Sequence, residues 1–98
     1  MNLNELMIHI REKPESFLQD DCIFQLRAFL RGFILAKNIA ANGVCDDHKL
    51  FERFNEYVRS QYGIDSTEVI SVEEVIHDAE QNKSYERYIE LWFNYVNH

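Results

Sequence analysis

Residues 21–41 read DCIFQLRAFLRGFILAKNIAA, and this stretch decides the fold. It contains no proline, and its apolar side chains recur with the spacing of a helix. Asp20 or Asp21 stands where a helix N-cap is expected, and Asn42 and Gly43 follow as a stop signal. The sequence therefore predicts one long helix over residues 21–41.

This helix is apolar around most of its circumference, which is typical of a helix that several neighbours bury. We therefore expect it to be the central helix of the fold. Gly32, in its middle, lowers helix propensity by about 1 kcal/mol relative to alanine. That residue predicts the close approach of a crossing helix. The apolar set comprises Ile23, Phe24, Leu26, Phe29, Leu30, Phe33, Ile34, Leu35, Ile39 and Ala40.

Further helices are predicted on both sides of this one. The first begins at the capping-box pair Asn2 and Glu5 and ends before Pro14. Another covers residues 46–63, and a break at residues 82–84 separates the last two. Their expected buried stripes are Leu3, Leu6, Met7 and Ile10; Leu50, Phe51, Phe54, Tyr57, Val58 and Tyr62; Val72, Val75, Ile76 and Ala79; and Tyr85, Tyr88, Ile89, Trp92, Phe93 and Val96.

The composition supports a helical fold. Three glycines and one proline in 98 residues are few for a sandwich or barrel, which needs many tight turns. Residues 69–72 form the only candidate strand. We predict a single domain over residues 1–98, all-α, as a compact bundle of about five helices around the central helix.

The net charge is −7, and residues 64–98 contribute −6 of it. A negative field repels phosphate backbones and anionic membranes, so we expect no direct nucleic-acid or membrane binding. Two readings of the acidic excess remain open: a solvated surface that aids solubility, or a face for a basic partner.

The cysteines and the N-terminus predict a cytoplasmic protein. One helix between Cys22 and Cys45 would separate them by about 35 Å, too far for a disulfide. Free thiols suit a reducing compartment. The first residues lack the basic start and long apolar run of a signal peptide. Residues 34–41 are the most apolar stretch, and Lys37 and Asn38 interrupt it.

No pattern in the chain predicts catalysis. His9, His48, His77 and His98 show no i, i+3 or i, i+4 pairing, and the cysteines form no CxxC motif, so no metal site is expected. A nucleophile elbow and a phosphate-binding glycine loop are absent from the sequence. We predict a protein that is not an enzyme, with no catalytic residues and no cofactor.

The predicted partner-binding residues are acidic and lie mainly on the fourth helix. That helix concentrates acids without an intervening base, whereas two more acids at the start of the third helix form an outlying part of the surface. The residues are Glu73, Glu74, Asp78, Glu80, Asp46 and Asp47. The polar stripe of Arg27, Arg31 and Asn38 is the next candidate surface.

Two segments carry a family resemblance. Residues 6–18, LMIHIREKPESFL, are followed from Ile23 by IFQLRAFLRGF, and an aromatic helix near the C-terminus contains YIELWF. Over residues 3–35 above all, this order resembles small helical immunity proteins of bacterial polymorphic or contact-dependent growth-inhibition toxin systems. The resemblance implies a cytosolic monomer that neutralises one cognate toxin, often a nuclease, in a 1:1 complex.

The charge of the chain agrees with that implication. Nuclease toxins have basic clefts, and an acidic inhibitor is steered into such a cleft at rates up to about 10⁸–10⁹ M⁻¹s⁻¹ at low salt. The first alternative is an acidic helical adaptor or subunit unrelated to toxins. The second is a small enzyme or ligand-binding bundle, which requires a deep polar pocket.

Overall fold

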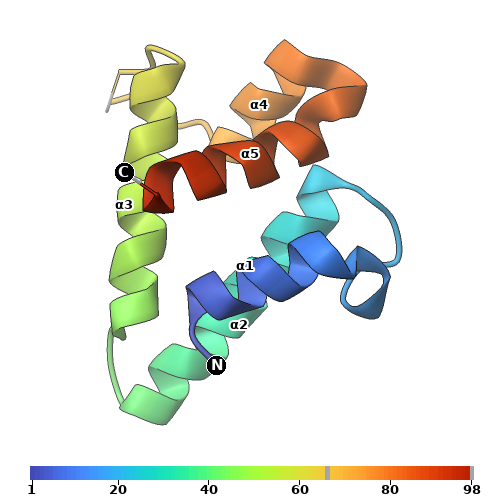
Figure 1. Cartoon of the computed structure of the whole chain (residues 1–98). Helices are drawn as coiled ribbons and strands as arrows, with labels where there is room; N and C mark the ends of the chain where they lie inside the picture. Colours follow the sequence, from blue (N-terminus) through green and yellow to red (C-terminus); the bar gives the residue numbers. More distant parts are fainter. Residues whose placement is uncertain (66, 98) are drawn as a thin grey trace.

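The computed structural model describes residues 1–65 and 67–97. The regular secondary structure of these residues is all helical, with no strand among them, and the helices pack compactly, which confirms the predicted class (Figure 1). In Figure 1, α1 and α2 lie in the lower half, α3 rises along one side, and α4 lies at the top. The α-helices are α1 (Leu3–Glu12), α2 (Ile23–Ala41), α3 (Asp46–Gln61), α4 (Val72–Glu80) and α5 (Ser84–Val96); short 3₁₀ turns cover Pro14–Ser16 and Gln81–Lys83.

The core is built around α5. Trp92 and Tyr88 are fully buried, and both rings pack edge-on against Phe54 of α3, at centroid distances of 5.0 and 5.3 Å. The indole nitrogen of Trp92 also donates to Oδ1 of Asn4 in α1, at 3.3 Å. Leu30 of α2 is buried, as predicted. The last helix therefore joins the first helix to the third.

The predicted cap of α1 is present, and the predicted cap of α2 is wrong. Asn2 and Glu5 form the full capping box of α1, and Ser71 accepts a bond from the Glu74 amide at the start of α4. The predicted aspartate cap of α2 does not form, because Cys22 is the N-cap residue and makes no side-chain cap bond. Asp20 instead bonds Gln25 through its amide and its carboxylate.

Helix α2 is buried on one side only, which corrects the prediction that neighbours bury it on several sides. Ile23, Leu26, Leu30 and Ile34 face the core. The opposite side is open to solvent, although several of its residues belong to the set that the sequence predicts to be buried. The other helices of so short a chain are too few to surround a helix of 19 residues.

Gly32 lies on this open side, so the predicted crossing helix is absent there. A Cβ built at Gly32 would have no atom within 4 Å. We expect Gly32→Ala to raise the free energy of unfolding by about 1 kcal/mol, because alanine is the better helix former. Urea denaturation measures the change. Gly63→Ala is the matched control: Gly63 has φ +65°, so alanine there should be destabilising. An unchanged midpoint for Gly32→Ala would contradict the prediction.

Alkaline pH should unfold the protein. Burial raises the pKa of Tyr85 to about 12 and that of Tyr88 well above its ordinary value of 10.0. Above pH 10 the unfolded chain loses these protons while the folded chain keeps them, so stability falls as pH rises toward the folded-state pKa values. Tyrosinate absorbance and circular dichroism, followed together, should show late ionisation coupled to loss of helix. All tyrosines ionising near their ordinary pKa with the helices intact would contradict this.

Cys22 and Cys45 are free and half-buried at the starts of α2 and α3, as the exclusion of a disulfide requires. Within residues 1–65 and 67–97, no helix combines the length and the apolar character that crossing a membrane requires.

Candidate functional site

The predicted acidic residues do not form one surface. Helix α3 starts at the lower end of the molecule, near the end of α2, whereas α4 lies at the upper end (Figure 1). Asp46 and Asp47 are therefore far from the acids of α4. The two groups need separate descriptions.

Glu73 is buried, which corrects its predicted place on the acidic surface. Its exposed fraction is 0%, because α4 turns Val72, Glu73 and Ile76 toward the core. The nearest cation is Arg31, whose Nη2 lies 4.0 Å from Oε1 of Glu73. Neither carboxylate oxygen accepts a hydrogen bond from any described residue. Glu73 is thus an internal group that a partner does not reach directly.

Tyr88 lies close enough to Glu73 to sense its charge. Burial is the main cause of the raised pKa of the Tyr88 phenol, and the negative charge of Glu73 raises it further. The Tyr88 hydroxyl is also without a hydrogen-bond partner among the described residues. Arg31, Glu73 and Tyr88 form a polar cluster inside the apolar core.

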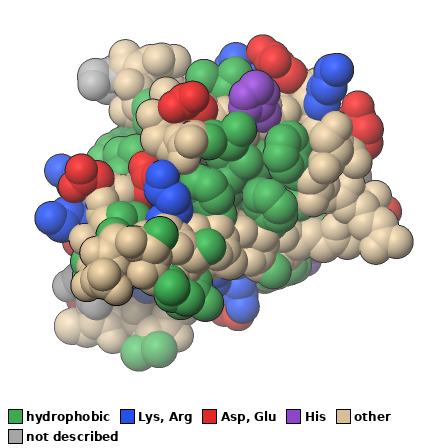
Figure 2. Space-filling model, turned by 90° about the horizontal axis from the view of Figure 1, so that it is seen from below, with side chains coloured by type: hydrophobic (Ala, Val, Ile, Leu, Met, Phe, Trp, Pro, Cys, Tyr) green, Lys and Arg blue, Asp and Glu red, His purple; other side chains and the backbone are tan. Residues whose placement is uncertain are grey.

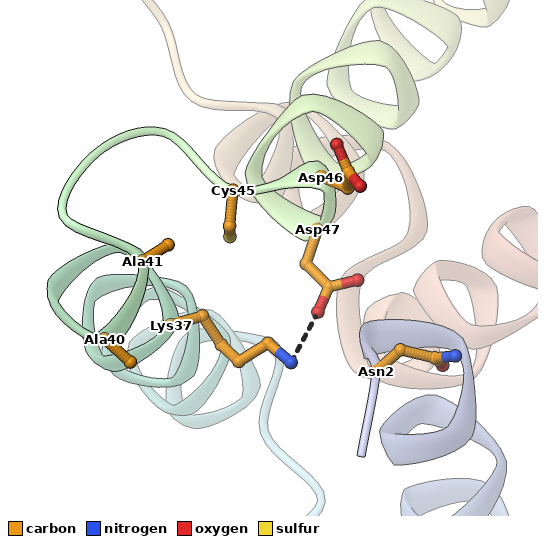
Figure 3. A pocket seen from close by; sticks show the side chains of 7 residues that line it. All are labelled: Asn2, Lys37, Ala40, Ala41, Cys45, Asp46 and Asp47. Atoms are coloured by element: carbon orange, nitrogen blue, oxygen red, sulfur yellow. Dashed lines mark ion pairs between the residues drawn. The ribbon is translucent and has the colours of Figure 1, made fainter.

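Asp47 is also buried, and the prediction of an exposed contact there is wrong. Its carboxylate lies 3.3 Å from Nζ of Lys37, which also donates to the Met1 carbonyl at 3.0 Å. Figure 3 shows Lys37 reaching across an open hollow toward Asp47, while Asp46 points away from this pair. The pair ties the end of α2 to the start of α3. The hollow measures about 470 Å³ and is lined by Asn2, Lys37, Ala40, Ala41, Cys45, Asp46 and Asp47.

The side chains that line the hollow indicate a structural role, which is to hold the end of α2 against the start of α3. Its lysine and buried aspartate already neutralise each other, and only Asp46 remains as an exposed charge. In the described part of the chain, no three His, Cys, Asp or Glu side chains gather closely enough to hold a metal ion.

On α4, two of the predicted acids are exposed as expected. Glu74 and Asp78 face solvent, whereas Glu80 is half-buried and accepts a hydrogen bond from the Tyr62 hydroxyl at 3.3 Å. Between the two exposed acids, His77 packs edge-on against Phe24 of α2, with centroids 5.2 Å apart. The free acids of α4 therefore lie beside the open side of α2.

That open side is the largest feature that sequence reasoning missed. We call it the α2 face. Leu35 and Ile39 are 60% and 68% exposed, and Phe24 is 37% exposed. Figure 2 views the molecule from the side where α1 and α2 lie, and hydrophobic side chains spread across the middle of that surface. The α2 face comprises Phe24, Ala28, Gly32, Leu35, Ala36, Ile39 and Ala40, all exposed and spaced along one side of the helix.

A groove between α2 and α3 borders the α2 face. Asn38 donates to Nδ1 of His48 at 2.7 Å, and His48 donates to Glu52 at 2.8 Å. These hydrogen bonds fix the polar side chains that line the groove. Arg31 and Asn38, from the second candidate stripe, both lie here. The groove measures about 360 Å³ and is lined by Arg31, Ile34, Leu35, Asn38, His48, Phe51, Glu52 and Asn55.

A signal for the α2 face was present in the sequence. A helix that is apolar all round needs neighbours on every side, and a chain of 98 residues has few helices to supply. Comparison with protein-family models, with curated proteins and with solved structures finds no match to this chain.

Proposed function

We propose that the protein is an immunity protein that binds a cognate toxin and neutralises it as a stoichiometric inhibitor. The α2 face is the observation that supports this proposal. Contiguous exposed apolar surface on a soluble domain is typical of a protein-binding site. The resemblance of residues 3–35 to helical immunity proteins points to a toxin as the bound protein.

The surface charge favours a basic partner. Glu74, Asp78 and Asp46 are exposed, and none of them belongs to an ion pair within the described residues. A toxin that cleaves nucleic acid carries a basic cleft for phosphates, and an acidic inhibitor complements that cleft. We therefore propose a nuclease toxin, bound 1:1 in the bacterial cytoplasm.

The direct test is co-purification with the product of the neighbouring gene, followed by an assay of that product. We expect a 1:1 complex, and we expect one molar equivalent of this protein to abolish toxicity or nuclease activity. A stable complex in which the neighbour keeps its activity would favour the adaptor instead. No complex and no protection would contradict the proposal.

Charge reversal on α4 should slow formation of this complex. In Glu74→Lys/Asp78→Lys the field that steers a basic partner is weakened, so the association rate should fall and depend less on salt. Stability should change by less than about 0.5 kcal/mol, because both side chains are exposed. Stopped-flow measurements over a range of salt concentrations test this.

The matched control is Glu12→Lys/Glu15→Lys, which makes the same charge change around the end of α1. We expect a smaller effect from it, since α4 borders the α2 face. Equal rates for wild type and the α4 variant would show that the α4 acids are only a solvated surface.

A further inference from the structure

We infer that the α2 face docks a helix of the partner, one that is apolar along its contact side and basic at its edges. The inference rests on the proposed function in taking the partner to be a protein. It adds where the partner binds, which secondary structure it presents and which charge it carries.

The shape of the α2 face suits a helix. Ala28, Gly32, Ala36 and Ala40 recur at every fourth position, and Leu35 and Ile39 stand beside them. Small residues let two helix axes approach closely, while large neighbours pack into the grooves of the incoming helix. The space above Gly32 is open. The row of small residues therefore leaves room for a second helix to approach, with Leu35 and Ile39 beside it.

Two of the three positive charges of α2, those of Arg31 and Lys37, lie near buried acids, whereas Arg27 has no acidic partner among the described residues. Arg31 faces the buried Glu73 at 4.0 Å, and Lys37 pairs with the buried Asp47 at 3.3 Å. Arg27 donates to the Ser71 hydroxyl at 3.4 Å. The two buried acids thus shape the surface indirectly, because they remove positive charge that would repel a basic partner.

Apart from Arg27, which lies beside Phe24, the unpaired charges around the α2 face are acidic. Asp21 lies just before α2, Asp46 lies just after its end, and Glu74 and Asp78 flank the His77 that contacts Phe24. None of these four acids is in an ion pair with a described residue. A second copy of the chain would bring acids against acids, so like-charge repulsion opposes a homodimer through this face. A basic helix meets the opposite charge at both ends.

A synthetic probe tests the charge and the place of binding. The probe is an amphipathic helix of about four turns made of leucine and lysine, and its control has glutamate in place of every lysine. We expect the lysine helix to bind at least about tenfold more tightly, with affinity falling as salt rises. Amide shifts in nuclear magnetic resonance should gather on residues 24–40. Equal binding of both helices, or shifts centred on other residues, would overturn the inference.

Gly32 variants distinguish the docking of a helix from non-specific hydrophobic binding. Gly32→Leu adds apolar surface, so a surface that binds only through non-specific hydrophobic contact would bind the lysine helix more tightly. If a helix packs against the small residues, the added side chain holds it away, and binding should weaken by about tenfold while Gly32→Ala binds nearly normally. Tighter binding by Gly32→Leu would overturn the inference. The monomer is expected to tolerate both changes, because Gly32 is exposed and nothing lies within 4 Å of a Cβ built there.

Two further variants locate the contact. Leu35→Ser should weaken binding of the lysine helix, whereas Val69→Ser should leave it unchanged, because Val69 is an exposed apolar residue outside the α2 face. Equal effects of the two substitutions would count against docking on α2.

The same variants separate this inference from the proposed function. If the neighbouring gene product is neutralised equally by wild type, Gly32→Leu and Leu35→Ser, the docking inference fails while the function stands. If the lysine helix docks as expected but the neighbouring gene product is not bound, the function fails while the docking surface stands.

Discussion

Trp92→Ala is expected to lower the free energy of unfolding by about 3–5 kcal/mol, which is a large share of the stability of a small domain. Trp92 is fully buried, and its ring packs at 5.0 Å from Phe54. Its removal leaves a cavity where α1, α3 and α5 meet. Urea or thermal unfolding measures the loss, and an incompletely folded variant at room temperature would agree with the upper end of the range.

Two variants separate the causes of that loss. Trp92→Phe keeps an aromatic ring in the core, but it removes the hydrogen bond to Asn4 and part of the buried ring volume, so it should lower stability by about 1–2 kcal/mol, less than Trp92→Ala. Leu30→Ala should cost about 2–5 kcal/mol, because it opens a cavity on the α2 side of the core. If Trp92→Ala lost less than Trp92→Phe, the described packing around α5 would be wrong.

Replacing Glu73 by leucine should have the opposite sign and raise the free energy of unfolding by about 1–4 kcal/mol. The carboxylate is fully buried, accepts no hydrogen bond from the described residues and has its nearest cation 4.0 Å away. Its desolvation is therefore poorly compensated. Arg31 is 54% exposed and returns to water when Glu73 is replaced, so no buried charge is left behind.

Arg31→Ala is the complementary variant. It leaves the Glu73 charge buried without its nearest cation, and we expect a loss of about 1–3 kcal/mol. Glu73→Gln serves as a control of similar shape without the charge. If Glu73→Leu lowered the free energy of unfolding by as much as Arg31→Ala, the Glu73 carboxylate would stabilise the fold. The expectation that its desolvation is poorly compensated would then be wrong.

The helices themselves were predictable because their signals are local. Helical spacing of apolar residues in residues 21–41 depends only on neighbours along the chain, and so does the capping box of Asn2 and Glu5. Leu30, Tyr88 and Trp92 are buried as expected, since each lies in the middle of its stripe.

Burial at the edge of a stripe was not predictable in the same way. Glu73 lies between Val72 and Glu74, and a small rotation of α4 decides whether Glu73 faces the core or solvent. That rotation depends on how α2 and α5 pack against α4, which no local pattern encodes. The same reason applies to Asp47, whose partner Lys37 belongs to another helix.

The side of α2 that stays open was hidden by composition. Because 13 of the 19 residues of α2 are apolar and they surround most of the helix, the hydrophobic pattern does not distinguish Leu35, which is exposed, from Ile34, which is buried. Only the number and placement of the other helices decide this. Local sequence patterns therefore predict the candidate site less well than they predict the helices.

The contact between α5 and α1 sets an order of events during synthesis. Asn4 precedes Trp92 by 88 residues, and Trp92 belongs to the last described helix. Until that helix emerges, the apolar stripe of α1 lacks a main partner and stays exposed in the nascent chain. Domains generally fold as units when their last element becomes available. Completion of the core would therefore wait until α5 has been translated, so translation speed, rather than the folding of any single helix, would set the delay.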